Sequence, residues 1–546
     1  MRAVRTLRTL LVAALLVPAA VQAAAHATPS SGTDTRPAVR RSADSGPAVR
    51  HDTSPPLRSM HSARPGAPVR PDRPRRLLPH RPSAPSHDPV VQRTGGRLPR
   101  IPVTTEFEGI RSERWLPPDP NAAVGTTQIV QTVNTRLAVY TKTGDTVVPP
   151  VSTGVLWSGF GDICEGQDQS DAVVRWDGMA RRWIITQLDS DEGAGRFYEC
   201  MAISTGADAS GSWHRYAYRY SRFNDYPKLS VWPDAYYITY NTEPLKTVCA
   251  LDRARMLVGD RARQQCFETD TFDQADASSI LLGSDMDGST PPPRGAPNLL
   301  VGLGPDDSLS FWKFHVDWAR PERSALTGPS VLRVAPYTPA CEGDDPERCI
   351  PQKGTRQKLD SISYWPMYRF AYRNFGSHQS LVLSHAVDAR GGVGERWYEL
   401  RLANGRPTVH QQSTYAPDRT YRWMGSLAQD RKGNIALGYS QSSPETYPSI
   451  RITGRRAGDP RGVMTFRETV VTAGRGSQTG CKDCHRWGDY TSMAVDPVDG
   501  CTFWYTNQYQ PATGNRNWRT RIAGFALPGC TPSHRDDHGR QWPGRS

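Results

Sequence analysis

Four aspartates recur in this sequence directly before an apolar segment with the character of a β-strand, and each segment is followed by a turn and a second apolar strand that ends in an amide. Paired carboxylates can act as acid and base on a glycosidic bond, and clustered carboxylate and amide oxygens can bind Ca²⁺. If the fold brings them together, these residues form a candidate ligand site. The four pairs are Asp119 with Asn134, Asp171 with Gln187, Asp225 with Asn241, and Asp489 with Asn507.

The geometry of a hairpin determines where these pairs lie. Its two strands are antiparallel, so the residue before the first strand and the residue after the second lie at the same end. If each hairpin is the innermost pair of a propeller blade, all four pairs surround one mouth of a central channel. Looser copies of the hairpin begin near Asn298, Tyr368 and Gly425, and in them the matching places are taken by His315, His385 and Ser440. The candidate catalytic residues at this mouth are Asp225, Asp489, Tyr226 and Tyr490.

A structural role for the same aspartates is the competing interpretation. An Asp before a strand commonly accepts hydrogen bonds from backbone N–H groups in an Asx turn, and Asn does the same after a strand. Arg373 lies among aromatic residues and could clamp an acidic sugar on the same face, although arginine stacked on aromatic rings is equally a packing device. Both interpretations stay open at the level of the sequence.

The repeated hairpin also indicates the architecture that must position these residues. Seven copies occur within residues 101–530, about sixty residues for each, which is enough for a four-stranded blade. We therefore predict an all-β fold, a single seven-bladed β-propeller over this range, with six or eight blades as alternatives. Two packed sandwich domains would need a linker that the sequence lacks. Residues 518–527 predict a last strand that shares a sheet with residues 104–109 and closes the ring.

Ten cysteines, all within the predicted propeller, indicate disulfides formed in an oxidising compartment. Because hairpins bring sequence neighbours together, nearest neighbours are the expected partners. The expected bonds are Cys164–Cys200, Cys249–Cys266, Cys341–Cys349, Cys481–Cys484 and Cys501–Cys530.

One of these pairs has a second interpretation. Cys481-Lys-Asp-Cys484-His485 matches the pattern that attaches c-type haem, in which two thiols bond the porphyrin and the histidine ligates iron. The motif occurs once, in a β-rich region, so a disulfide-closed loop is favoured over a haem-bearing redox protein. No other cofactor is indicated apart from the Ca²⁺ already considered.

The two ends of the chain differ from the middle. Residues 1–27 have a basic start, an uncharged apolar run and then small residues, the order of a cleaved secretory signal. Residues 28–100 are rich in Pro and Arg with almost no large apolar residues, which predicts a disordered linker, and the tail 531–546 has a similar character. We expect a secreted, extracellular protein that does not span a membrane.

The distribution of charge excludes one class of partner. The formal net charge is +13, but the signal, linker and tail carry this excess and leave residues 101–530 near zero. A folded nucleic-acid reader would carry positive charge on a docking face, so nucleic acid is not an expected partner. Serine-hydrolase, phosphate-loop and zinc-protease motifs are absent from the sequence. We expect a monomer.

Several motifs resemble a group of uncharacterised exported proteins of high-GC bacteria. These motifs are Asp119-Pro-Asn-Ala-Ala-Val-Gly125, Asp225-Tyr-Pro-Lys228, Trp397-Tyr-Glu-Leu-Arg401, Tyr421-Arg-Trp-Met-Gly425 and Arg486-Trp-Gly-Asp-Tyr490. The group is distantly similar to sialidase-type propellers. The resemblance implies a propeller fold, but the Asp-box of that type is missing and its arginine triad and Tyr/Glu nucleophile pair cannot be placed in this sequence.

These observations predict a secreted propeller that acts on or binds extracellular glycans, such as a polysaccharide or a cell-wall glycan. As an enzyme it would be a sialidase-like glycoside hydrolase or a polysaccharide lyase with the channel-mouth carboxylates as acid and base. The alternative is a non-catalytic propeller that binds carbohydrate or protein at the cell envelope, because fold alone does not determine function.

Overall fold

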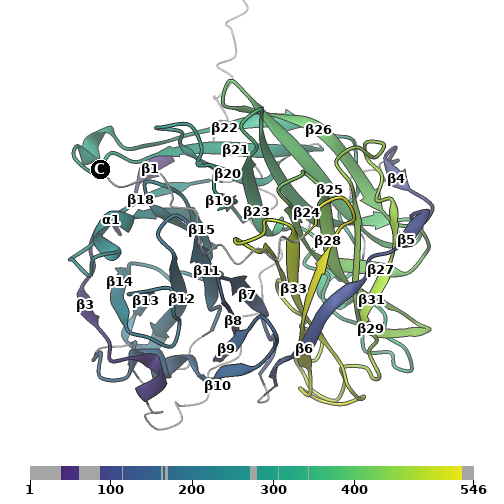
Figure 1. Ribbon diagram of the computed structural model, residues 1–546, viewed down its shortest axis with the longest axis horizontal. Coiled ribbons are helices and arrows are strands. Elements are labelled where there is room, and N and C mark those ends of the chain that lie inside the picture. The colour runs from purple at the N-terminus through teal and green to yellow at the C-terminus, as the bar shows by residue number, and fades with distance from the viewer. Residues whose placement is uncertain are drawn as a thin grey trace, which may run out of the picture. The chain divides into compact units, whose positions relative to one another are not determined.

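β-Strands account for almost all regular structure in the computed structural model (Figure 1). It describes residues 39–60, 87–112, 115–161, 164–165, 170–270, 280–304, 307–341 and 344–531. The predicted signal lies outside these residues, and so does all but the first residue of the predicted tail. The described residues belong to one compact unit. Its short helical segments are η1 (Leu57–Ser59), η2 (Thr153–Trp157), η3 (Glu192–Ala194), α1 (Arg253–Met256), η4 (Pro321–Arg323) and η5 (Pro346–Arg348).

The first three sheets are built from consecutive antiparallel strands. The first contains β7 (Asn121–Val124), β8 (Gln128–Val133), β9 (Arg136–Thr141) and β10 (Thr146–Ser152). The second contains β11 (Val173–Asp177), β12 (Arg182–Asp191), β13 (Arg196–Ser204) and β14 (Trp213–Tyr220). The third contains β15 (Lys228–Val231), β16 (Tyr236–Tyr240), β17 (Lys246–Leu251) and β18 (Arg263–Thr269).

Two further four-strand units are joined by a parallel pairing of β19 with β23. They contain β19 (Leu282–Asp287), β20 (Asn298–Gly304), β21 (Ser308–His315), β22 (Ala325–Arg333), β23 (Met367–Asn374), β24 (Gln379–Ala389), β25 (Gly392–Ala403) and β26 (Arg406–Tyr415). The next sheet contains β27 (Tyr421–Gln429), β28 (Ile435–Ser443), β29 (Thr446–Arg455) and β31 (Thr469–Thr472). The last contains β32 (Ser492–Val495), β33 (Thr502–Tyr509), β34 (Arg519–Ala526) and β6 (Val103–Arg111).

The last sheet joins the two ends of the strand order. β34 pairs antiparallel with β6, with Ile522 opposite Phe107. This confirms the predicted pairing of residues 518–527 with residues 104–109. Closure in this way gives the outer edge of the last three strands a partner from the beginning of the chain.

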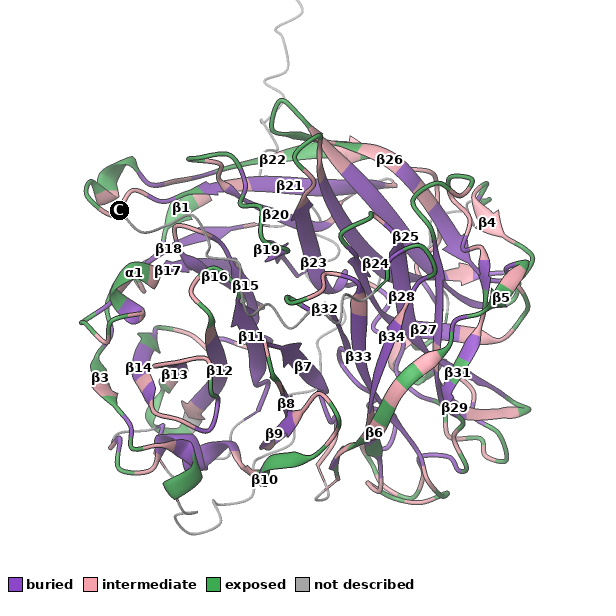
Figure 2. Ribbon diagram, in the orientation of Figure 1, coloured by how far each residue is buried: buried purple, intermediate pink, exposed green. Residues whose placement is uncertain are grey.

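The first strand of each unit lies innermost (Figure 2). These strands contact one another in cyclic order, β7 with β11, β11 with β15, β15 with β19, β19 with β23, β23 with β27, β27 with β32, and β32 with β7. Most of these strands are short and buried on both faces. This explains why their sequences are largely continuous apolar runs and do not alternate between apolar and polar residues. We call the end where these strands begin the N-end of the channel and the end where they finish the C-end.

Glycines allow large aromatic side chains to pack between sheets. A Cβ atom at Gly438 in β28 would lie 2.5 Å from Cζ of Tyr505 in β33, and one at Gly125 would lie 2.5 Å from Cζ2 of Trp183. Any side chain at these positions would collide with a buried ring. The close packing of adjacent sheets therefore depends on these two glycines.

Part of the predicted linker is ordered, which corrects the expectation of disorder for residues 39–60 and 87–100. These two segments contribute β1 (Val39–Arg41), β2 (Gly46–Pro47), β3 (Arg50–Thr53), β4 (Val91–Gln92) and β5 (Leu98–Arg100). β1 and β2 pair with β18, β3 with β14, β4 with β26, and β5 with β30 (Phe466–Arg467). Outer strands offer unpaired N–H and C=O groups, so backbone pairing orders a segment that has little apolar surface to bury. Residues 61–86 lie outside the described residues.

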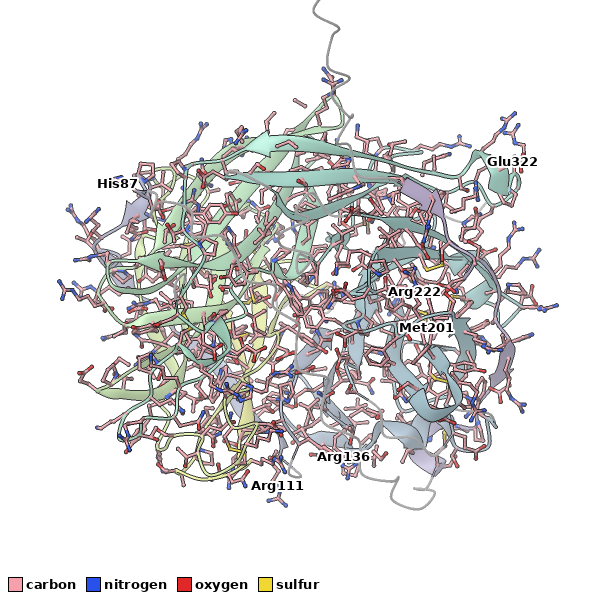
Figure 3. The ribbon with its side chains drawn as sticks, turned by 180° about the vertical axis from the view of Figure 1, so that it is seen from behind. His87, Arg111, Arg136, Met201, Arg222 and Glu322 are labelled. Atoms are coloured by element: carbon pink, nitrogen blue, oxygen red, sulfur yellow. A yellow bond between two sulfur atoms is a disulfide. The ribbon has the colours of Figure 1, made fainter. Side chains whose placement is uncertain are left out.

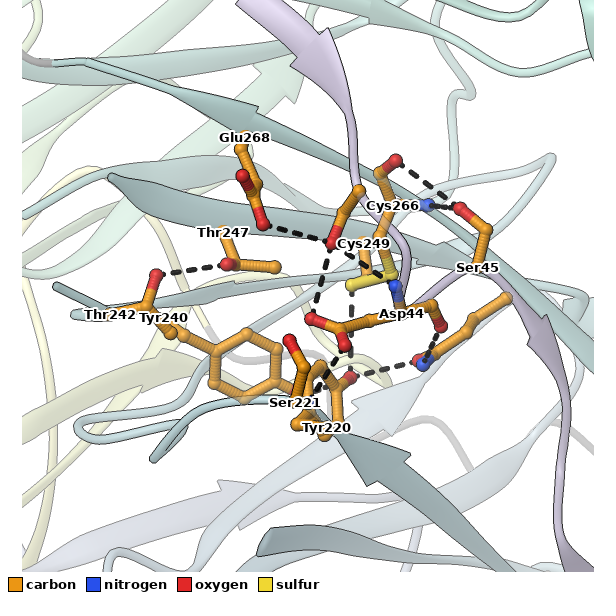
Figure 4. Close-up of a disulfide and its surroundings, with 12 residues drawn as sticks. Asp44, Ser45, Tyr220, Ser221, Tyr240, Thr242, Thr247, Cys249, Cys266 and Glu268 are labelled. Atoms are coloured by element: carbon orange, nitrogen blue, oxygen red, sulfur yellow. Dashed lines mark hydrogen bonds between the residues drawn. A yellow bond between two sulfur atoms is a disulfide. The ribbon is translucent and has the colours of Figure 1, made fainter. Parts of the chain in front are cut away.

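All five expected disulfides are present. One of them, Cys249–Cys266, joins β17 to β18 beside residues 39–60, which we call the first N-terminal segment (Figure 4). The backbone N–H of Ser42 donates to the Cys266 carbonyl at 2.9 Å, and the Cys266 N–H donates to Ser45 Oγ at 2.9 Å. The disulfide thus stiffens the strand on which the N-terminal segment docks.

Candidate functional site

The same backbone turn precedes three of the inner strands. Asp119, Asp171 and Asp489 all have a positive φ, of 48°, 61° and 57°, and before β15 it is Tyr226, next to Asp225, with φ of 55°. Non-glycine residues seldom adopt this left-handed conformation. Asp119, Asp171 and Asp489 therefore share one backbone conformation before their strands, whereas in the β15 unit Tyr226 has it and Asp225 lies one residue earlier.

A buried lysine, Lys228 at the start of β15, lies among these aspartates. Burial lowers the pKa of Lys228 to about 8, and the four carboxylates oppose that fall. Its side chain is 1% exposed, and Asp119, Asp171 and Asp489 are exposed by 3% or less. The like charges of the four aspartates are thus gathered around a cation, which removes much of their mutual repulsion. We call Lys228 and the four aspartates the Lys228 cluster.

Two tyrosines enclose the ammonium group of Lys228. Its Nζ lies 3.2 Å from the centre of the Tyr226 ring and 4.0 Å from that of Tyr490. Aromatic faces attract cations, and the attraction is strengthened where water is excluded. The Tyr226 hydroxyl donates to the backbone carbonyl of Asp489 at 2.9 Å. Both predicted catalytic tyrosines are therefore engaged in packing around the lysine.

The carboxyl of Asp171 is the group of the cluster with a pKa close to neutrality. Burial raises the pKa of Asp171 to about 6 against the lowering effect of Lys228. Asp225 and Asp489 raise it further because like charges disfavour ionisation. A raised carboxyl pKa beside other carboxylates is a feature of acid–base sites, although buried structural networks produce it as well.

The chain between β22 and β23 covers the N-end. In this segment the Trp365 ring lies 4.4 Å from that of Tyr226, and Cys341 is bonded to Cys349. Arg486 Nη2 lies 2.6 Å from Asp489 Oδ2 and its Nε lies 3.9 Å from Asp360 Oδ2. Lys228, Asp119, Asp171 and Asp489 are buried at this end, whereas Asp225 is partly exposed.

Two of the predicted amides bond to backbone at the same end. Asn134 Nδ2 donates to the Pro117 carbonyl at 3.0 Å, and Asn134 Oδ1 accepts from the backbone N–H of Asp171 at 2.8 Å. Asn241, which is partly exposed, donates its backbone N–H to the Asp225 carbonyl at 2.9 Å, and its side-chain Oδ1 accepts from Lys246 Nζ at 2.6 Å. Asn134 thus links one sheet to the next, which is a structural role.

The remaining amides are buried. Asn507 Nδ2 donates to Ser440 Oγ at 3.1 Å, where the indole N–H of Trp487 also donates at 3.1 Å. Gln187 is fully buried in β12, and its side-chain amide has no hydrogen-bond partner within the described part of the chain. None of these amides opens onto solvent.

The two predicted histidines have different surroundings. His385 is fully buried in β24, where its Nε2 lies 3.0 Å from the Tyr398 hydroxyl, and burial lowers its pKa to about 3. His315 was expected at the channel mouth, but it is an exposed residue at the end of β21. The innermost strand of that unit is β19, not the strand from Asn298 that the sequence suggested, so His315 belongs to an outer hairpin.

The C-end of the channel is open and contains a cavity of about 170 Å³. The ends of β7, β11, β15, β19, β23 and β32 surround it, together with the turns that follow β27 and β32. Its lining combines apolar, aromatic and charged side chains. The lining residues include Trp176, Asp287, Gly288, Ser289, Arg373, Arg431, Asp496 and Asp499. Arg373 was expected on the same face as the aspartates, but it lies at the opposite end of the channel because it is at the end rather than the start of β23.

A buried charge network lies behind this cavity. Arg369 is fully buried, with Nε at 2.7 Å from Asp285 Oδ2 and Nη2 at 2.7 Å from Asp287 Oδ1. Arg175 Nε lies 2.8 Å from the same Asp285 oxygen. Burial works against the charged form of Asp287, yet Arg369 and the neighbouring arginines hold its pKa below the usual value. These ion pairs give the cavity a rigid, charged floor.

The C-x-x-C-H motif is occupied by a disulfide. Cys481 and Cys484 are bonded to each other, so neither offers a thiol to a porphyrin, and the c-type haem interpretation is not supported. His485 Nδ1 lies 3.3 Å from the Lys482 carbonyl. Among the described residues there is no group of three or more His, Cys, Asp or Glu side chains that could hold a metal ion. Nor does this part of the chain contain a helix long and apolar enough to cross a membrane.

Lys228, Arg175 and Arg369 were not among the residues predicted from the sequence. The available signal was a charged residue within an otherwise apolar inner strand, as in Lys228-Leu-Ser-Val231 and Val173-Val-Arg175-Trp. A charged side chain buried on both sides of a strand must be paired, so it indicates a partner on a neighbouring strand.

Comparisons with known proteins were made for the whole chain. No protein-family model and no curated protein matches it. Among solved structures it is similar to the polysaccharide lyase Uly1, with 9% identity, a TM-score of 0.36 and coverage of 80% of this chain and 100% of the other. It is also similar to the extracellular domains 1–2 of Drosophila Semaphorin 1b, with 7% identity, a TM-score of 0.32 and coverage of 80% of this chain and 88% of the other.

A third solved structure is an α-L-arabinanase from Penicillium chrysogenum complexed with arabinobiose. It is 9% identical with a TM-score of 0.34, over 64% of this chain and 98% of the other. Similarities this weak carry no argument about the function of the chain. No family model supports the resemblance to exported proteins of high-GC bacteria.

Proposed function

We propose that this protein is an exported seven-bladed β-propeller that binds a sugar of an extracellular glycan at the C-end cavity without cleaving it. Seven innermost strands in cyclic contact, within the described residues, and the β6–β34 pairing support the blade number. Five disulfides support an oxidising destination, in agreement with the signal-like N-terminus of the sequence.

The observation that carries this proposal is the contrast between the two ends of the channel. Three of the four carboxylates that could cleave a glycosidic bond are buried around Lys228, whereas the C-end has an open cavity. Concave sites lined by apolar and aromatic groups with a few placed polar groups are typical of ligand pockets. Trp176 contributes to the apolar part of the lining, and the charged side chains can orient the hydroxyl groups of a sugar.

The size of the cavity limits the ligand. A volume of about 170 Å³ lies below the roughly 300 Å³ at which pockets for drug-sized ligands begin. It suits a single sugar unit, at the end of a chain or as a branch, and not a long polysaccharide segment. Binding at the end of a glycan is therefore part of the proposal.

The test is a binding screen of the purified protein against plant, fungal and bacterial glycans, followed by calorimetry on the ligands found. Ser289 is exposed at the cavity, so Ser289→Trp should block the site and abolish binding. Ser59→Trp, on the exposed first N-terminal segment, is the matched control and should bind normally. Absence of any glycan ligand, or full binding by Ser289→Trp, would refute the proposal.

A second candidate is a glycoside hydrolase or lyase at the Lys228 cluster. It is favoured by the pKa of about 6 of Asp171 next to Asp225 and Asp489. It requires the segment between β22 and β23 to move, since this segment covers the cluster. New reducing ends or unsaturated products released from any glycan in the screen would support this candidate over non-catalytic binding.

A further inference from the structure

We infer that the C-end cavity recognises the acidic group of a sugar, such as a uronic acid or a sulfated sugar, through the guanidinium of Arg373. This inference rests on the proposed binding of a sugar at the same cavity and adds the class of ligand. Its basis is one buried arginine that lines the cavity with hydrogen-bonding capacity to spare.

Arg373 is held at the cavity by the end of β23. The residue is 6% exposed, and its Nε and Nη2 atoms have no hydrogen-bond partner among the described residues. Nε and Nη2 form one edge of the guanidinium fork, the geometry that binds two oxygens of a carboxylate or sulfate. Both atoms are buried, so a ligand reaches them only after the side chain turns toward the cavity. Buried N–H groups of a charged side chain that lack a partner are costly, so their retention calls for an explanation.

A neighbouring glycine makes room for this side chain. Gly288 follows β19 with φ of 78°, and a Cβ atom there would lie 2.6 Å from Arg373 Nη1. Most side chains would be strained in this backbone conformation and would also press on the guanidinium. The turn after β19 therefore accommodates Arg373 at the cavity without contributing a hydrogen bond from a side chain.

Arg373 lies in a network of charges in which its neighbours form the close ion pairs. The network at the C-end has three guanidinium groups, of Arg175, Arg369 and Arg373, and two carboxylates. Both carboxylates form their close ion pairs with Arg175 and Arg369. The carboxyl of Asp430 also acts on Arg373, so three carboxylates face the three guanidinium groups, and the Asp430 oxygens accept hydrogen bonds from Lys432 N, Asn434 N and Asn434 Nδ2.

The other acids of the cavity are also engaged. Asp496 Oδ2 lies 2.7 Å from Lys142 Nζ, and Asp499 accepts hydrogen bonds from Cys501 N and Thr502 N at 2.7 and 2.9 Å. Lys142 offsets the charge of Asp496, whereas backbone N–H groups orient Asp499 without neutralising it. Arg431, an exposed lining residue, adds a positive charge at the cavity. The guanidinium groups of Arg373 and Arg431 are the groups of this cavity that would bind an anionic ligand.

The first experiment changes the ligand and leaves the protein intact. Calorimetry should compare methyl β-glucuronide with its neutral methyl ester and with methyl β-glucoside, and glucose 6-sulfate with glucose. We expect the acidic sugar of at least one set to bind about 10- to 100-fold more tightly than its neutral counterpart, the range for a hydrogen bond to a charged group. The two sets distinguish a carboxylate from a sulfate ester. Inorganic sulfate should bind far more weakly than either sugar.

The second experiment changes Arg373. Arg373→Met should reduce affinity for the acidic sugar to that for the neutral sugar, while Arg373→Lys, which keeps the charge but not the fork, should give an intermediate loss. Arg467→Met, at an exposed position on the outer rim, is the matched control and should bind as the unchanged protein does. If Arg373→Met does not fold, the comparison of ligands still decides the question.

The outcomes separate the two proposals. Equal affinity for acidic and neutral sugars, with Ser289→Trp still abolishing binding, overturns the role of Arg373 and leaves the glycan-binding proposal standing. Inorganic sulfate that binds as tightly as the sugars overturns the inference as well, because the site would then recognise an anion without a sugar. Failure of every glycan and sugar to bind overturns both proposals.

Discussion

The ammonium nitrogen of Lys228 lies 3.2 Å from the centre of the Tyr226 ring, at the point where four aspartates converge. This contact explains how equivalent turns can place like charges at one end of the channel. A buried cation stabilises the carboxylates, and the rings exclude water from it. The arrangement accounts for the aspartates without invoking a substrate.

Replacement of the central cation should destabilise the fold. Lys228→Met leaves buried carboxylates uncompensated, and loss of one partner of a buried ion pair costs about 3–5 kcal/mol. Urea denaturation should show a lower free energy of unfolding by this amount. Lys432→Met, at an exposed position, is the control and should change it by less than about 0.5 kcal/mol. Equal stability of the two variants would show that Lys228 does not hold the cluster together.

Replacement of a single aspartate distinguishes structure from catalysis. Asp489→Asn keeps the shape of the side chain but weakens the ion pair with Arg486 and removes a charge next to Lys228. We expect a loss of about 3 kcal/mol in stability with unchanged glycan binding by the folded protein. Calorimetry on protein confirmed as folded by circular dichroism provides the measurement.

The half-buried Asp225 provides the comparison for that experiment. Asp225→Asn should cost less stability than Asp489→Asn, since solvent reaches its carboxylate. Loss of an activity in either variant, with the melting temperature unchanged, would favour the hydrolase or lyase candidate.

The buried carboxyl of Glu395 should make stability depend on pH. Burial raises the pKa of Glu395 to about 8, while Ser384 and the Gly425 backbone lower it less than burial raises it. The folded state then binds more protons than the unfolded state between about pH 4.5 and 8, so stability falls as pH rises through this window. Glu395→Gln should abolish this contribution, which amounts to at most about 5 kcal/mol.

The measurement is the difference in unfolding free energy between the original protein and Glu395→Gln across that window. Glu322→Gln, exposed at the outer margin of the molecule, serves as the control and should run parallel to the unchanged protein (Figure 3). A constant difference between the original protein and Glu395→Gln would contradict the prediction.

The first N-terminal segment should resist trypsin. Its chain is paired with β18 and β14, and Asp52 accepts two hydrogen bonds from Arg215 at 2.7 and 2.6 Å. Cleavage after Arg50 requires this segment to detach, so Asp52→Ala should accelerate it by about tenfold. A time course followed by mass spectrometry measures the rate. Rapid cleavage of the unchanged protein after Arg50 would show that the predicted linker is free there after all.

Much of the fold follows from the sequence because its determinants are local. Each hairpin joins strands that are close in the chain, so apolar periodicity and turn residues predict strands and their order. The disulfides follow from the same proximity. The one misplaced hairpin begins at Asn298, since β19 is separated from β20 by a longer connection that hides the true inner strand.

Only the tertiary structure decided the environment of the candidate sites. The cover over the N-end comes from a segment between two units, and its contact of Trp365 with Tyr226 joins residues far apart in the sequence. The pairing of Arg369 with Asp285 and Asp287, and the spare capacity of Arg373, likewise depend on which strands are neighbours around the channel.

The sequence did not predict that the N-terminal segments adopt an ordered structure, for the same reason. Composition reports how much apolar surface a segment can bury, and for residues 39–60 that amount is small. It does not report whether another part of the fold offers a free strand edge, such as that of β18 or β14. Local patterns therefore determined the strands and the pairs that they bring together. Long-range contacts decided which charged groups are buried around Lys228 and which face solvent at the C-end. The reason is that burial and charge compensation depend on neighbours that lie far apart along the chain.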